Sequence, residues 1–223
     1  MGKWGIVISA FYALILLGLI LPVYVLYAMG PPTIGVFRQD LIEACQNGIL
    51  WLPLGIFISG QALLLFLSVD TSFKRLKPRA HIAVSSTVAA LLMGILTAVG
   101  VWSLGFGIVG EKFGDTYLPN VGVAVVTCAA LWLVWGILFY FYFRDSSTIV
   151  TRLVSWLLKG SVLELLIAVP CHIIVRRRHD CSAPIVTSFG IAAGIAIMLL
   201  SFGPSVLFLY KKRLDAYPPR PSA

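Results

Sequence analysis

Long apolar runs separated by short polar segments dominate the pattern of hydrophobic and polar positions along this chain. A helix needs about 20 apolar residues to cross the hydrocarbon core of a bilayer. Five runs meet this length, and they cover residues 5–28, 48–69, 82–109, 121–143 and 184–210. A sixth run, 161–175, is long enough only if its helix begins near residue 152. The pattern therefore predicts about six transmembrane helices, the fifth of them covering residues 152–175.

The same runs exclude a membrane β-barrel. Barrel strands alternate apolar and polar residues over about ten positions, and no such alternation is present in this sequence. Residues 89–96, for example, are almost uniformly apolar, which is typical of a helix surrounded by lipid and other helices. We therefore predict an all-α fold, a polytopic transmembrane helical bundle that forms one domain over residues 1–213 and is followed by a short Pro-rich tail at 214–223.

Two connecting segments have an amphipathic pattern. Residues 34–46 and 146–159 each mix charged and apolar side chains at helical spacing. One or both are predicted to lie as helices along the membrane surface. The alternative is that they are the ends of membrane-spanning helices whose cationic side chains reach the headgroup region.

The composition agrees with lipid as the surrounding solvent. Of the 223 residues, 59% are hydrophobic and 12% are charged, whereas a soluble domain has about 45–50% and about 25%. The net charge of +8 comes from short clusters between the apolar runs, which argues against a nucleic-acid-binding face. We expect a multi-pass integral protein of a cell membrane, in contact with the lipid bilayer.

Clusters of Lys and Arg predict how the chain is oriented, because such residues in short loops stay on the cytoplasmic side. With six spans, most of the basic residues fall on one side, which places both termini in the cytoplasm. These residues are Lys74, Arg75, Lys77, Arg79, Arg144, Arg152, Lys159, Lys211, Lys212 and Arg213. The triplet Arg176, Arg177 and Arg178 follows the fifth span and would face outward, against the rule.

The segment 171–181 holds two of the four cysteines and two of the three histidines, namely Cys171, His172, His179 and Cys181. Two thiolates and two imidazoles form a complete ligand set for Zn²⁺. Neighbouring side chains point apart on a helix, however, so a metal site would require this segment to be unwound. Two free thiols are the favoured outcome, a disulfide between Cys171 and Cys181 is favoured over a metal, and no cofactor is expected.

Glu164 is the acidic residue that lies well inside an apolar span. An ionised carboxylate at this depth is unfavourable, so the group should be protonated, paired with a cation or exposed to a water-filled cavity. Cys171 follows seven residues later, about two turns away on the same helix face. Gln61 is a second buried polar residue, and Gly190 and Gly194 are spaced for close packing between helices of this chain.

The sequence contains none of the phosphate-loop, metalloprotease, nucleophile-elbow or kinase motifs, and this weighs against an enzyme. The leading hypothesis is a small structural or accessory subunit, or a scaffold, that has a membrane-protein partner or forms an oligomer. One alternative is a transporter of a small solute or anion, built from inverted three-helix repeats, whose ligand contacts Glu164, Gln61 and the arginine triplet. The other is a thiol- or metal-dependent membrane enzyme centred on Cys171, His172, His179 and Cys181.

Overall fold

The computed structural model describes residues 2–29, 42, 46, 48–69, 78–117, 121–143, 149–180 and 183–216. Within these ranges the chain forms helices and no strands. The long helices are α1 (Gly2–Met29), α3 (Gly48–Val69), α5 (Pro78–Val109), α7 (Val121–Phe143), α8 (Ile149–Arg177) and α9 (Ala183–Ala216), and a short helix, α6 (Glu111–Tyr117), follows α5. The predicted all-α class is confirmed for this part of the chain.

Four of the described helices are long and apolar enough to cross a membrane. The qualifying stretches are Arg79–Val109, Gly122–Phe143, Ile149–Arg177 and Ala183–Ser201. Helices α1 and α3 contain shorter apolar stretches, Ser9–Val23 and Leu54–Leu67. The structure therefore supports a helical membrane protein in contact with lipid.

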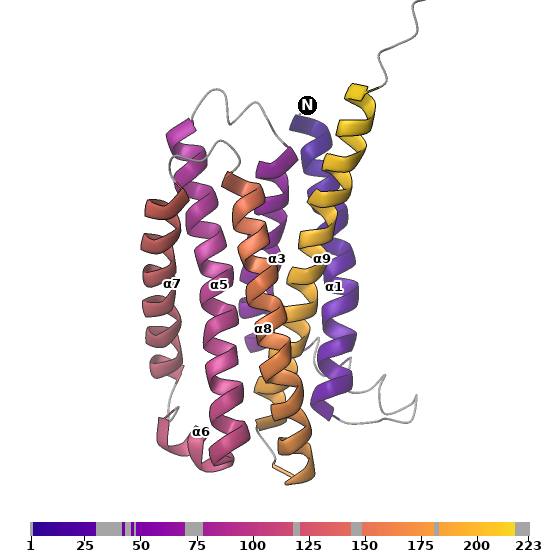
Figure 1. Ribbon diagram of the computed structural model, residues 1–223. Coiled ribbons are helices and arrows are strands. Elements are labelled where there is room, and N and C mark those ends of the chain that lie inside the picture. The colour runs from indigo at the N-terminus through magenta and orange to yellow at the C-terminus, as the bar shows by residue number, and fades with distance from the viewer. Residues whose placement is uncertain are drawn as a thin grey trace, which may run out of the picture.

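The long helices lie side by side and alternate in direction, so that α5 and α8 run parallel and α9 runs antiparallel to both (Figure 1). Helix α7 lies at the edge of the bundle beside α5, and α6 turns across the end of α5 (Figure 1). The first turn of α1 and the last turn of α9 lie at the same end of the bundle (Figure 1).

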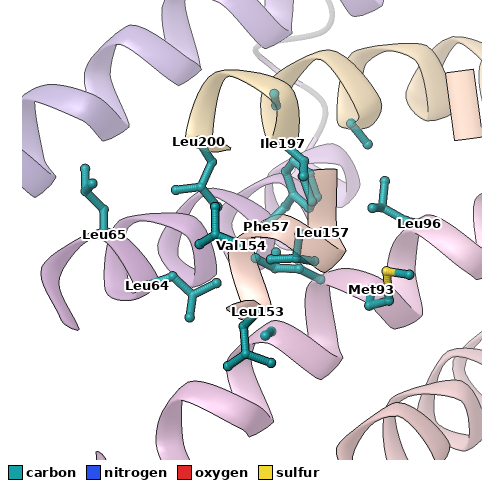
Figure 2. Close-up of a cluster of buried hydrophobic side chains, with 14 of the residues drawn as sticks. Phe57, Leu64, Leu65, Met93, Leu96, Leu153, Val154, Leu157, Ile197 and Leu200 are labelled. Carbon is teal, nitrogen blue, oxygen red and sulfur yellow. The ribbon is translucent and has the colours of Figure 1, made fainter. Parts of the chain in front are cut away.

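A hydrophobic core forms where α3, α5, α8 and α9 meet. Figure 2 shows side chains from these helices pointing toward one another, and the most enclosed of them are at most 1% exposed: Phe57, Leu64, Leu96, Leu153, Leu157, Ile197 and Leu200. Leu153 and Leu157 are one turn apart on α8, as are Ile197 and Leu200 on α9, so each helix presents a continuous apolar stripe to the others.

The second predicted surface helix, at residues 146–159, is wrong over its described part. Residues 149–159 are the first three turns of α8, which continues without a break through Gly160 and Pro170. Ile149, Leu153 and Leu157 are buried in the core, whereas Arg152 and Lys159 lie on the exposed side. The amphipathic pattern of this segment thus reflects burial of its apolar face against neighbouring helices. The helix predicted at 152–175 begins three residues earlier, at Ile149.

Several sequence-based predictions lie outside the described residues. The first amphipathic segment, 34–46, is described only at positions 42 and 46. The basic residues Lys74, Arg75, Lys77 and Arg144, together with the tail after residue 216, also lie outside the described ranges.

Candidate functional site

A seam of small and polar residues runs between α5, α8 and α9, and Glu164 lies in it. Glycines of α5 meet side chains of α8 in a regular register: Gly100 meets Glu164, and Gly107 meets Cys171. Both steps are seven residues, the spacing at which two nearly parallel helices keep the same faces in contact. The sequence places Glu164 and Cys171 on one face of their helix, and the structure shows in addition that this face turns toward α5.

Glu164 is enclosed by backbone from two neighbouring helices. Its side chain is 3% exposed. A Cβ added to Gly190 of α9 would lie 2.6 Å from Oε1, and one added to Gly100 of α5 would collide with Oε2. The carboxyl group therefore occupies the space that side chains at these two glycines would otherwise fill.

Small residues surround the carboxyl group at this level of the bundle. The Cβ position of Gly190 lies 3.0 Å from Val99 Cγ1 of α5 and 3.3 Å from Ala168 Cβ of α8. Close approach of helices through small residues is how membrane helices gain packing energy. One turn further along α9, Gly194 faces Leu165 of α8, so the expected packing of the two α9 glycines within the molecule is confirmed.

Two buried oxygens in this region have no hydrogen-bond partner: Oε1 of Glu164 and the hydroxyl of Ser103. Ser103 is fully buried on α5, three residues after Gly100 and four before Gly107, which is the spacing of one helix face. Several hydroxyls in the bundle donate to carbonyls of their own helix, as Thr97 and Ser161 do, whereas the buried hydroxyls of Ser9, Ser85 and Ser86, like that of Ser103, have no partner among the described residues. The seam thus holds two oxygens whose hydrogen-bonding capacity is unused.

A buried hydrogen bond joins α8 to α9 two turns from Glu164. Nδ1 of His172 lies 2.8 Å from the Thr187 hydroxyl oxygen, and both side chains are buried. The Thr187 hydroxyl in turn lies 3.2 Å from the carbonyl oxygens of Ala183 and Pro184. A hydroxyl has one proton to donate, so when it donates to its own helix, Nδ1 of His172 carries the proton and donates to Thr187.

Cys171 is a free thiol and is buried. Its sulfur lies 2.7 Å from the Cβ position of Gly107. The predicted Cys171–Cys181 disulfide is therefore not formed in this structure, and Cys181 itself lies outside the described residues. Among the residues that the structure describes, no group of three or more His, Cys, Asp or Glu side chains is placed to hold a metal ion. Cys171, His172 and His179 are thus not gathered around a common point.

The arginine triplet lies at the end of α8, far from Glu164. Twelve residues separate Glu164 from Arg176, or about 18 Å along a helix. The helix ends in a tight turn in which His179 adopts the left-handed conformation with φ of 59°. Its N–H donates to the carbonyl of Arg176, and the Asp180 N–H donates to that of Val175, the pattern of a Schellman cap.

This cap docks against the corner between α5 and α6. Gly110 forms the corner with φ of 80°. Its Cβ position lies 3.7 Å from Nη1 of Arg178 and 3.9 Å from Oδ2 of Asp180. The last turn of α8 is therefore packed against another element at this end of the bundle.

Gln61 belongs to a different contact. It lies fully buried on α3, and its Oε1 accepts a hydrogen bond of 2.7 Å from the Tyr12 hydroxyl of α1. Its Nε2 has no hydrogen-bond partner. The structure thus places the proposed ligand-binding residues in three separate surroundings: Gln61 between α1 and α3, Glu164 in the seam, and the arginine triplet at the end of α8.

Sequence reasoning missed Ser103, Thr187 and the glycine positions that enclose Glu164. One signal was available, because Gly100 and Gly107 repeat the seven-residue spacing of Glu164 and Cys171. Thr187 gave no comparable signal, since its pairing with His172 depends on how far α9 is displaced along α8.

Comparison with known proteins identifies no relative: no family model, no curated protein and no solved structure matches this chain.

Proposed function

We propose that this protein is a six-span integral membrane protein that serves as a structural or accessory subunit of a membrane complex. Besides the four long apolar helices, α1 and α3 carry apolar stretches and run alongside them (Figure 1). An even number of crossings agrees with the chain ends of α1 and α9 lying at one end of the bundle (Figure 1). The Lys and Arg clusters assign that end to the cytoplasm.

The observation that carries the subunit proposal is the peripheral position of α7. In an 18-residue apolar stretch of its Gly122–Phe143 span only 6% of the residues are buried, against 56% in the corresponding stretch of α5 and 67% in that of α9. Its inner face is anchored to α5, since the Trp132 indole donates to the Thr87 carbonyl and the Trp135 indole donates to the Thr97 hydroxyl. Its outer face leaves Leu133, Ile137 and other large apolar side chains exposed.

A helix that is fixed on one side and apolar on the other suits contact with a helix of a second protein. Apolar surface alone does not drive association in lipid, and close packing does so instead. The end of α7 that is rich in aromatic rings offers an irregular surface for close packing. There Tyr140 lies against Phe141, with 5.8 Å between the ring centroids. We therefore assign the partner-binding surface to the outer face of α7.

Photo-crosslinking in native membranes tests this assignment. A benzophenone side chain at Leu133 or Ile137 of α7 is expected to give a discrete adduct with a second protein. The matched control is the same group at Leu163 or Leu166 on the outer face of α8, positions that are similarly exposed, where only lipid adducts are expected. The subunit proposal fails if the α7 positions give lipid adducts alone.

A second candidate function, transport of a small solute or anion, is favoured by one observation, the buried carboxyl of Glu164. Ionisable residues inside membrane spans commonly belong to transport pathways. On this hypothesis, purified protein in liposomes takes up a labelled small carboxylate or phosphate, and Glu164→Gln abolishes the uptake. Unchanged uptake by that variant would contradict the transport hypothesis. The structure also argues against a single ligand site, because Gln61 and the arginine triplet lie apart from Glu164.

A further inference from the structure

Glu164 lies in a closed space, and no ion pair to its carboxyl group is found among the residues that the structure describes. Oε1 has no hydrogen-bond partner, and both carboxyl oxygens face glycine backbone, that of Gly100 on one side and Gly190 on the other. Val99 and Ala168 complete the wall at this level. Lys159, the nearest basic residue before it on α8, is exposed and lies 5.6 Å from the ring of Trp156.

The titratable groups on the described parts of α5, α8 and α9 also place no positive charge at the carboxyl group. On α8 itself, Cys171 and His172 follow two turns later, and His172 is bonded to Thr187 of α9. The α5 face contributes Gly100 and Ser103, and the α9 face contributes Gly190 and Thr187, which carry no charge. An ionised carboxylate in these surroundings would be both desolvated and unpaired, a highly unfavourable state inside a membrane.

The size of the space selects among possible ligands. Hard metal cations bind about six oxygen atoms arranged around them. Here the carboxyl oxygens lie so close to the glycines that not even a methyl group fits beside them. The other unpartnered oxygen in the seam is the single hydroxyl of Ser103. A proton neutralises a carboxylate without the surrounding oxygen ligands that a metal ion needs, so it fits this space.

We propose that the seam between α5, α8 and α9 is a proton-binding site, in which Glu164 is held as a neutral carboxylic acid by the backbones of Gly100 and Gly190. The site requires glycine on both neighbouring helices, because any side chain there would occupy the position of the carboxyl group. Release of the proton requires the three helices to separate or water to enter the seam. The site is independent of the partner surface on α7.

Infrared spectroscopy of the full-length protein in phosphatidylcholine vesicles at neutral pH tests the proposal. A protonated carboxylic acid has a C=O stretching band that is separate from the carboxylate bands, and this band shifts when its proton is replaced by deuterium. We expect the wild-type protein to show the band and Glu164→Gln to lose it. The control variants Glu43→Gln and Glu111→Gln, at the other two glutamates of the chain, should retain it.

A second measurement uses the unmodified sequence and does not depend on the folding of any variant. Wild-type protein is produced in cells supplied with glutamate that carries ¹³C in its side-chain carboxyl group. Its carboxylic acid C=O band should then lie at a lower frequency than in the unlabelled protein. The proposal is overturned if the band does not move on labelling, or if Glu164→Gln removes a carboxylate band instead. Either result would leave the crosslinking test of α7 unaffected.

Discussion

Oε1 of Glu164 lies 2.6 Å from the point that a Cβ of Gly190 would occupy, so a side-chain carboxyl of α8 and the backbone of α9 share one small volume. Contacts of this kind tolerate no added atoms, because the interior around them is already close-packed. We therefore expect Gly190→Ala to destabilise the bundle by about 1–3 kcal/mol, the usual cost of overpacking. Thermal unfolding in detergent micelles measures this.

The chain offers a matched control and a rescue for that substitution. A Cβ on Gly18 of α1 would meet nothing within 4 Å, so Gly18→Ala should be neutral or slightly stabilising. Shortening the opposing side chain with Glu164→Ala should restore part of the stability that Gly190→Ala loses. Additive effects of the two substitutions would show that these residues do not compete for the same space.

Thr187→Val is expected to weaken the contact between α8 and α9. The substitution keeps the size of the side chain but removes the hydroxyl that bonds His172. Hydrogen bonds between membrane helices contribute about 0.6–2 kcal/mol, and we expect a loss in this range in the same unfolding assay. Thr127→Val is the control, because the Thr127 side chain is half-buried and its hydroxyl donates to the Val123 carbonyl of its own helix. Equal effects of the two variants would contradict a role for the bond in joining the helices.

Tyr12→Phe should destabilise the contact between α1 and α3 by about 1 kcal/mol, because it removes the hydroxyl that bonds Gln61 and leaves a buried amide without its partner. Adding Gln61→Leu should recover much of the loss, since the unpartnered amide is then gone as well. Tyr142→Phe, at a position that is 74% exposed, should have little effect. Unfolding midpoints of the two single variants and the double variant test this, and a double variant less stable than Tyr12→Phe alone would refute the interpretation.

His179→Gly should raise the stability of the α8 cap by about 0.5–1 kcal/mol. His179 has φ of 59°, a conformation that glycine adopts without the steric penalty of a side chain. Gly110→Ala should have the opposite effect, by about 1–2 kcal/mol, since φ is 80° there. The two unfolding midpoints should move in opposite directions. A lower midpoint for His179→Gly would mean that the His179 imidazole makes a contact that stabilises the protein by more than the backbone strain destabilises it.

The sequence by itself determined that the chain forms helices long and apolar enough to cross a membrane, because the length and uniform apolarity of the runs depend only on the order of residues. The boundaries of 48–69 and 121–143 agree with α3 and α7 for this reason. The same property explains the error at 146–159. A helix with one charged and one apolar face has the same sequence pattern whether its apolar face lies on the membrane surface or against other helices. Only the burial of Leu153 and Leu157 distinguishes the two arrangements.

What only the tertiary structure decided is which residues meet. Sequence spacing relates positions on one helix, so it could pair Glu164 with Cys171, but it carries no information on how α5, α8 and α9 are aligned with one another. That alignment places Glu164 between Gly100 and Gly190, joins His172 to Thr187, and assigns Gln61 to Tyr12. In lipid the hydrophobic effect does not distinguish one alignment of apolar helices from another. The choice is made by close packing of small residues and by a few hydrogen bonds, which exist only once the helices are assembled.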